Sequence, residues 1–287
     1  MRITEAFDLY RAEYILDTNQ SRKTEENHVY ACKSLVRFLG DIEITTLTRQ
    51  MVRAWKSNLE MRNKAPNTIR GYVIKLRVVL KWLRAEGHQC VNPELIPVPK
   101  RGASTIRFIP PEDVRKLTEA CDIPGSKHIN RARNKAIVAL LFSSGLRVSE
   151  LCRLDITHVR FNTFSVMTKG GENQVFFVDD NARGYIDKYL NMRADNNPAL
   201  FISDINKLRM TPDNVQEVFK TLRKYTGLDV RPHVMRHSFG TDLMNNGADI
   251  RRVQELMHHK NIQTTAQYLH FVDGQLEEMH NEFHSKI

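Results

Sequence analysis

Five prolines between positions 91 and 111 constrain the fold of this chain more than any other feature. They are Pro93, Pro97, Pro99, Pro110 and Pro111, and the basic segment Lys100-Arg101-Gly102 lies among them. Proline lacks the backbone N–H that helices and sheets need, so no long helix can cross this segment. We therefore predict two domains, residues 1–97 and 109–287, joined by a linker at residues 98–108. A chain of 287 residues is long enough for both.

The first domain has the pattern of a helical bundle. Apolar residues recur every three or four positions, beginning with Ile3, Phe7 and Tyr10. The same spacing predicts three further helices, at about residues 24–39, 48–60 and 66–86, and strand signals are absent. We predict a compact four-helix bundle.

A basic segment of this domain suits contacts with nucleic-acid phosphates. Seven lysines and arginines lie from Arg62 to Arg84 without one acidic residue, and the whole chain carries a net charge of +10. Some of them stand near the start of a predicted helix, where backbone N–H groups favour anions. The predicted DNA contacts are Arg62, Lys64, Asn67, Thr68, Arg70, Lys75, Arg77 and Lys81. The alternative is a solvated helix face on a basic protein, which charge alone does not exclude.

The second domain combines helices with one predicted hairpin. Phe164–Thr168 and Val175–Val178 have strand character and flank a polar turn, and residues 154–161 could add a third strand. Helices are predicted at about residues 131–142, 180–192 and 211–226. Gly145 interrupts the helical pattern and places Arg147 at a turn between two helices. The chain as a whole is therefore predicted to be mainly α with a small antiparallel sheet.

The stretch 231–268 holds side chains suited to chemistry on a phosphate. It begins with RPHVMRHSFGT and ends with LMHHKNIQTTAQY. Arginine presents a planar fork of donors that matches phosphate oxygens. Histidine exchanges a proton near neutral pH, and tyrosine can act as a covalent nucleophile when its surroundings activate it.

Together with two upstream segments, this stretch resembles the tyrosine recombinases, the family of lambda integrase and the Xer proteins. Their signature is Arg, Lys, His-x-x-Arg, His and Tyr, in that order. Residues 143–151, SSGLRVSEL, look like the first-arginine box, and Lys169-Gly170-Gly171 stands where the family has its lysine turn. The six matching positions are Arg147, Lys169, His233, Arg236, His259 and Tyr268.

The resemblance implies DNA strand exchange through a 3′-phosphotyrosyl intermediate and a Holliday junction, with neither a metal ion nor ATP. Tyr268 would attack the scissile phosphate, and Lys169 would protonate the departing 5′-oxygen. Arg147 and Arg236 would hold the non-bridging oxygens, where charge develops.

The histidines carry the remaining roles, and three positions depart from the family pattern, the mildest being Ser144, where threonine is common. His233 would assist proton movement at the tyrosine, and His259 would donate a hydrogen bond to the phosphate. The family usually has Gly-Lys-Gly at its lysine turn, whereas this chain has Thr168 first. It also usually has Leu-Gly-His before its tyrosine, whereas this chain has Met-His-His, so His258 is an alternative phosphate donor.

The resemblance also implies an architecture and partners. An N-terminal SAM-like core-binding domain and an α+β catalytic domain would form a C-shaped clamp on double-stranded DNA with an inverted-repeat core site. A homotetramer would hold two such sites, linked by an apolar helix at 275–287, and accessory DNA-bending proteins could assist. The alternative is that this helix packs on its own domain. Four widely spaced cysteines and no apolar membrane segment suggest a cytoplasmic, nucleoid-associated protein.

Three other functions compete with this interpretation. A type IB topoisomerase shares the catalytic set, and a non-catalytic DNA-binding protein could share the fold. A zinc protease would need His-Glu-x-x-His, but Val234 occupies the glutamate position, so no metal site is predicted.

Overall fold

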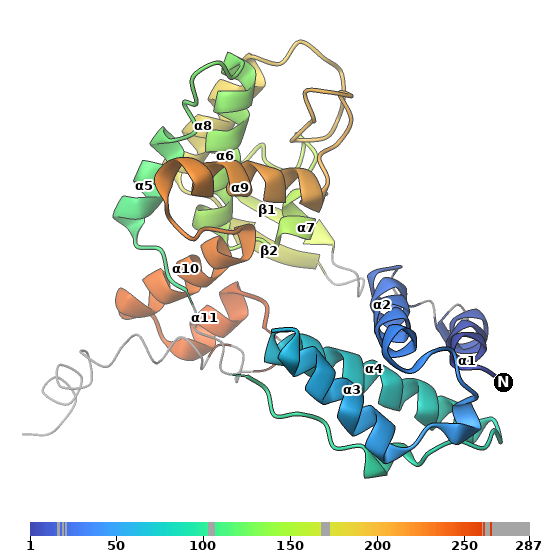
Figure 1. Ribbon diagram of the computed structural model, residues 1–287. Coiled ribbons are helices and arrows are strands. Elements are labelled where there is room, and N and C mark those ends of the chain that lie inside the picture. The colour runs from blue at the N-terminus through green and yellow to red at the C-terminus, as the bar shows by residue number, and fades with distance from the viewer. Residues whose placement is uncertain are drawn as a thin grey trace, which may run out of the picture. The chain divides into compact units, whose positions relative to one another are not determined.

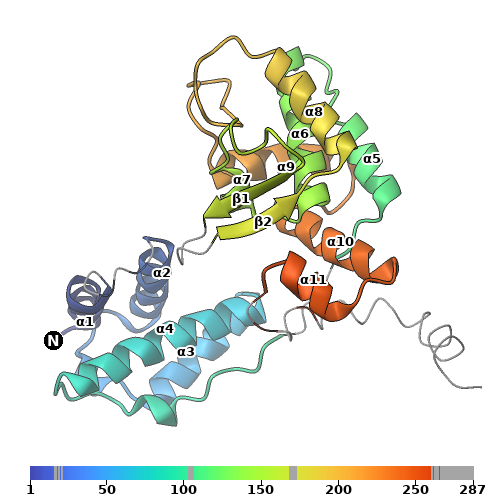
Figure 2. The same cartoon turned by 180° about the vertical axis from the view of Figure 1, so that it is seen from behind.

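The computed structural model of the chain describes residues 1–15, 18, 20, 22–102, 107–167, 173–259, 261 and 265. The chain divides into two compact units, Met1–Ser104 and Thr105–Ile287. Figure 1 shows both units, and Figure 2 shows them from behind.

The described part of the first unit contains helices and no strands. Its elements are α1 (Ile3–Tyr10), a π-helical turn (Arg11–Ile15), α2 (Arg22–Leu39), a 3-10 turn (Ile44–Thr46), α3 (Arg49–Met61), α4 (Pro66–Ala85) and a second 3-10 turn (Pro93–Leu95). The Thr48 hydroxyl accepts the Met51 N–H at 3.2 Å and so caps α3. The four predicted helices are confirmed.

Trp55 lies in the core of this unit. Its side chain is fully buried, its ring stacks on that of Tyr72 with centroids 6.3 Å apart, and its indole N–H donates to Ser34 Oγ at 3.2 Å. The first apolar stripe is buried as well, with Ile3 and Phe7 at most 2% exposed. Burial of these stripes, rather than helix propensity, holds the short helices together.

The chain that follows the helices is tied back to α4. Arg70 Nη1 donates to the Pro99 carbonyl at 2.5 Å, and Asn67 Oδ1 accepts the Gly102 N–H at 3.0 Å. These side chains bond backbone groups that have no helical partner. The chain up to residue 102 is therefore attached to the first unit.

The second unit surrounds one apolar helix. Its elements are α5 (Pro111–Glu119), α6 (His128–Ser144), α7 (Val148–Leu151), β1 (Thr163–Met167), β2 (Asn173–Phe177), α8 (Asp180–Asn191), α9 (Pro212–Thr226), α10 (Pro232–Asn245) and α11 (Ile250–Leu256). Ile137 and Val138 of α6 are both fully buried, although they face different sides of the helix. Helix α6 accordingly packs against α5, α8 and α10 (Figure 2).

The sheet of the second unit is a two-stranded antiparallel hairpin. Strands β1 and β2 pair with Phe164 opposite Phe176. The third strand considered at 154–161 is wrong, because Asp155 makes only an isolated bridge with Ala199. The Leu200 N–H does donate to the Leu154 carbonyl at 2.8 Å, but the pairing stops there because the chain turns, with the His158 N–H donating to the Asp155 carbonyl at 3.1 Å. None of the described helices is long and apolar enough to cross a lipid bilayer.

Candidate active site

Arg147 lies at the junction of α6 and α7. A buried carboxylate orients it: Glu150 Oε2 accepts the Arg147 N–H at 2.7 Å, and Oε1 accepts Nη1 at 2.8 Å. Glu150 is 5% exposed, whereas Arg147 is half-buried. One carboxylate therefore fixes both the backbone and the guanidinium of Arg147, and leaves the guanidinium accessible.

Gly145 sets the turn that leads into Arg147. It ends α6 in the left-handed conformation, with φ 63°. A Cβ at this position would lie 2.7 Å from Cε1 of Phe239 and closer still to Cδ1. Helix α10, which carries Phe239, can therefore approach this turn only because residue 145 has no side chain.

Arg236 connects the separate parts of the site. It lies on α10 and is 2% exposed. Its Nη1 donates to the Gly145 carbonyl, and its Nη2 donates to the Met257 carbonyl. The planar guanidinium fork thus links the turn before Arg147 to the turn before His259, so the two turns cannot move independently.

His233 is the second residue of α10 and packs against a second histidine one turn later. The ring centroids of His233 and His237 are 4.4 Å apart, with an interplanar angle of 73°. Desolvation, followed by the positive charges of Arg236 and Arg147, lowers the pKa of His233. Desolvation also lowers the pKa of His237, to about 4. Both imidazoles are therefore neutral at pH 7, and His233 can accept a proton.

His259 completes a cluster of four of the predicted residues. Its Nδ1 lies 2.9 Å from Oγ1 of Thr265. Desolvation, and then the charges of Arg236 and Arg147, lower its pKa to about 4. Since Arg236 bonds the carbonyls of Gly145 and Met257, each two residues before Arg147 and His259, and shares the first turns of α10 with His233, these four side chains lie in one basic cluster.

His258 makes a different contact. Its Nε2 lies 2.9 Å from the Val175 carbonyl oxygen, and its ring meets that of Phe176 edge-on with centroids 4.9 Å apart. The imidazole is therefore engaged with strand β2.

Two of the six predicted catalytic residues, Lys169 and Tyr268, lie outside the described residues. The helix predicted at 275–287 lies outside them as well.

The predicted DNA contacts of the first unit form two groups. Asn67 and Arg70 bond the segment 99–102, and Arg77 pairs with Glu94 at 2.6 Å. The other five are Arg62, Lys64 and Lys81, which are exposed, and Thr68 and Lys75, which are half-buried. The side chains of the first group already bond other groups of this unit. The side chains of the second group are therefore more available to donate hydrogen bonds to DNA phosphates.

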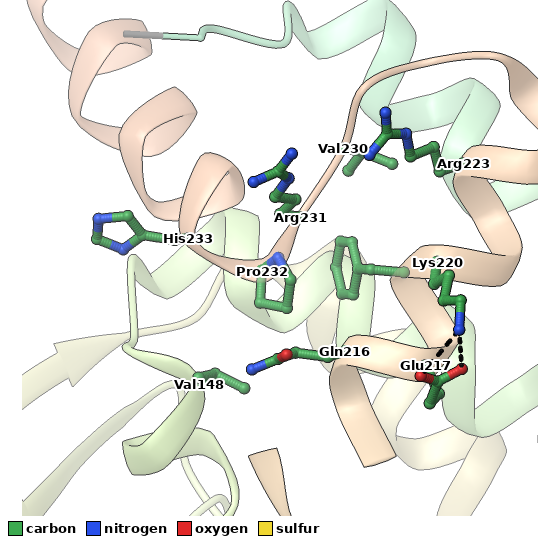
Figure 3. A pocket seen from close by; sticks show the side chains of 10 residues that line it. Val148, Gln216, Glu217, Lys220, Arg223, Val230, Arg231, Pro232 and His233 are labelled. Carbon is green, nitrogen blue, oxygen red and sulfur yellow. Dashed lines mark hydrogen bonds and ion pairs between the residues drawn. The ribbon is translucent and has the colours of Figure 1, made fainter. Parts of the chain in front are cut away.

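A pocket of about 440 Å³ lies beside His233 (Figure 3). Its lining includes Val148, Gln216, Lys220, Arg223 and Arg231. Lysine and arginine side chains of α9 and of the segment before α10 line it together with Glu217, which pairs with Lys220 at 3.2 Å. Because His233 and Val148, the residue after Arg147, also line it, the pocket borders the cluster.

The cluster suits an anionic, tetrahedral group. Two guanidiniums can share the charge of a phosphate, and neutral imidazoles can move protons beside it. Among the described residues, no three histidine, cysteine or carboxylate side chains are grouped so as to hold a metal ion.

Three residues of the site were not predicted from the sequence. Arg147 precedes α7, and Glu150 is the third residue of that helix. A glutamate at this position often bonds the backbone N–H of the residue before the helix, so the sequence could have indicated its contact with Arg147. Phe239 and Thr265 carry no such local signal, because their contacts depend on how distant segments pack.

The fold and the cluster define the class of the protein. The chain belongs to the phage integrase family, whose model matches residues 107–274, and the model of the phage integrase N-terminal SAM-like domain matches residues 7–87. It is a site-specific recombinase of the tyrosine class, which confirms the family and the fold class predicted from the motifs.

Individual relatives agree with this assignment. The chain is 33% identical to tyrosine recombinase XerA of Pyrococcus horikoshii, over 75% of this chain and 74% of that protein. It is 30% identical to tyrosine recombinase XerD of Rickettsia bellii, over 96% and 95%. The fold is similar to that of a lambda integrase dimer bound to a COC′ core site, with a TM-score of 0.76 at 17% identity, covering 93% and 95%. It is also similar to that of the Tn1549 transposon integrase in complex with circular intermediate DNA, with a TM-score of 0.73 at 20% identity, again covering 93% and 95%.

Proposed function

We propose that the chain cuts and rejoins DNA strands through a 3′-phosphotyrosyl intermediate formed by Tyr268. The observation that carries this proposal is the cluster of Arg147, His233, Arg236 and His259, joined through the buried Arg236 guanidinium. These are four of the six residues of the recombinase signature, and they come from three separate segments of the chain.

In the first step, the Tyr268 oxygen forms a bond to phosphorus, and the bond from phosphorus to the 5′-oxygen breaks. The phenol proton passes to His233, which is neutral because its pKa is lowered. Lys169 gives a proton to the departing 5′-oxygen. A 5′-hydroxyl of a second strand then reverses these transfers, so the phosphodiester energy is conserved and neither ATP nor a metal ion is required.

The arginines and His259 stabilise the transition state. Arg147 and Arg236 hold the two non-bridging oxygens, whose charge increases as the fifth bond to phosphorus forms. When the Thr265 hydroxyl donates to Nδ1, 2.9 Å away, the His259 proton lies on Nε2, from which it can be donated to the phosphate.

The DNA partner and the assembly are part of the proposal. Exposed Arg62, Lys64 and Lys81, with Thr68 and Lys75, contact the phosphate backbone of an inverted-repeat core site. Four copies act on two sites in the cytoplasm, at the nucleoid, with residues 275–287 docking into a neighbouring copy. Support for the DNA partner comes from similar folds, a lambda integrase dimer bound to a COC′ core site and XerH bound to a palindromic difH substrate.

A covalent trap tests the function. The protein is incubated with fragmented genomic DNA and denatured, and the DNA that stays attached is sequenced. A Tyr268→Phe protein is the matched control. We expect fragments that share one short inverted repeat and that disappear with Tyr268→Phe.

The other outcomes are equally informative. Attachment at scattered sequences would indicate a topoisomerase, for which the family match gives no support. Attachment that survives Tyr268→Phe would assign the nucleophile to another residue. Binding without any covalent product would indicate a DNA-binding protein and would refute the proposal.

A further inference from the structure

His258 occupies a backbone position at which a side chain is unfavourable. Two hydrogen bonds close the end of α11, from His258 N to the Glu255 carbonyl at 2.9 Å and from His259 N to the Gln254 carbonyl at 3.0 Å. The residue at the centre of this closure adopts the left-handed conformation, and His258 has φ 49°. Glycine is the usual residue there because it has no Cβ. The side chain of His258 therefore needs an interaction that compensates for the backbone strain.

Strand β2 supplies that interaction. The Val175 carbonyl can only accept, so the His258 Nε2, 2.9 Å away, must carry the proton and donate it. The imidazole edge also packs on Phe176, which is 1% exposed and stacks on Phe164 in the core of the second unit. One side chain thus fastens the end of α11 both to the backbone of β2 and to a buried ring of that strand.

Strand β2 is the strand through which the chain leaves the lysine turn. Residues 168–172 connect β1 to β2, and Lys169 is one of them. Val175 is the third residue of β2. On the other side, His258 directly precedes His259, which belongs to the basic cluster. Through its contact with Val175, His258 therefore joins β2 to the segment that carries His259.

We propose that His258 is a positioning residue that holds β2 against the histidine turn and so keeps Lys169 in register with the scissile phosphate. This inference rests on the proposed role of Lys169 as the acid that protonates the 5′-oxygen. It differs from a direct phosphate contact by His258, because the donor nitrogen is already bonded to the Val175 carbonyl. A glycine at this position could not make this contact.

The test uses His258→Gly in the full chain. Glycine keeps the left-handed backbone and removes the contact with β2, so the variant folds with an unchanged or higher melting temperature. Single-turnover cleavage is measured on a synthetic suicide duplex that carries the inverted repeat recovered by covalent trapping. A second duplex has sulfur in place of the bridging 5′-oxygen. The sulfur leaves as a thiolate at neutral pH, so it needs no proton donor.

We expect His258→Gly to cleave the ordinary duplex about tenfold more slowly than the unmodified protein, and to recover to within about threefold on the sulfur duplex. Lys169→Ala tests the proposed role of Lys169 as the acid. Its cleavage must likewise recover on the sulfur duplex. His259→Ala is the matched control one residue away, and it stays slow on both duplexes, because its defect lies at the phosphate.

Each other result has a distinct meaning. Recovery of Lys169→Ala without recovery of His258→Gly would overturn the positioning role and leave the proposed function intact. No recovery of either would refute the role of Lys169 as the acid, and with it the inference. Unchanged cleavage of the ordinary duplex by His258→Gly would overturn the inference directly.

Discussion

Gly145→Ala should destabilise the catalytic unit more than the same change at a second, similar glycine. Gly145 and Gly227 both end helices in the left-handed conformation, with φ of 63° and 73°. An alanine in this conformation costs roughly 1–2 kcal/mol at either position. At Gly227 a Cβ meets nothing within 4 Å, whereas at Gly145 it meets the Phe239 ring at 2.7 Å or less.

The difference between the two variants therefore isolates the contact with Phe239. Overpacking of this kind costs about 1–3 kcal/mol, so we expect a total loss of about 2–5 kcal/mol for Gly145→Ala. Gly227→Ala should lose only about 1–2 kcal/mol. Urea unfolding followed by circular dichroism measures both, because both positions lie in the same unit.

Two results would refute this reasoning. Equal losses for the two variants would mean that the ring moves aside without cost. Adding Phe239→Leu to Gly145→Ala should recover about 1 kcal/mol or more, because leucine removes the ring edge. No recovery would mean that the contact is not the cause. Cleavage should fall more for Gly145→Ala than for Gly227→Ala, since Arg236 bonds the Gly145 carbonyl.

The remaining predictions concern the charges of both units. Glu150→Gln removes the charge that holds Arg147 and should slow single-turnover cleavage about tenfold; a gel shift should show unchanged DNA affinity. Arg236→Lys cannot make both carbonyl bonds and should slow cleavage about 100-fold or more, so a rate near that of the unmodified protein would contradict the linking role. His28 is 4% exposed with a pKa lowered to about 4 by desolvation and then by Lys75. Its unfolded pKa of about 6.5 is higher, so stability falls as pH drops from 6.5 towards 4, by about 2 kcal/mol at pH 5. Urea unfolding at pH 7 and at pH 5 measures this change. Between the two pH values the free energy of unfolding of His28→Phe should fall by about 2 kcal/mol less than that of the unmodified protein.

The sequence predicted elements whose signals are local. Pro66 and Gly87 delimit α4, and Thr211 and Gly227 delimit α9, because proline, glycine and capping hydroxyls act within one helical turn. The alternation around Phe164 and Phe176 likewise predicted the hairpin, since each strand buries one face.

Contacts between distant segments were not predictable in this way. At 154–161, where a third strand was considered, the sequence did not reveal that Leu200 and Arg209, both far along the chain, donate to the Leu154 carbonyl. The motif indicated Arg236 as a phosphate ligand, but not its bonds to two carbonyls 91 and 21 residues away. The same is true of His258, which looked like a phosphate donor in sequence and contacts Val175 in the fold. Motifs name the residues of the site, whereas packing determines which of them support the others.

Mapping the DNA-linked peptide tests the central claim most directly. The covalent complex is digested with nuclease and trypsin, and the modified peptide is sequenced by mass spectrometry. The account predicts one adduct, a nucleoside 3′-phosphate on Tyr268 within residues 261–286. An adduct on any other residue, or a 5′-phosphate linkage, would contradict it.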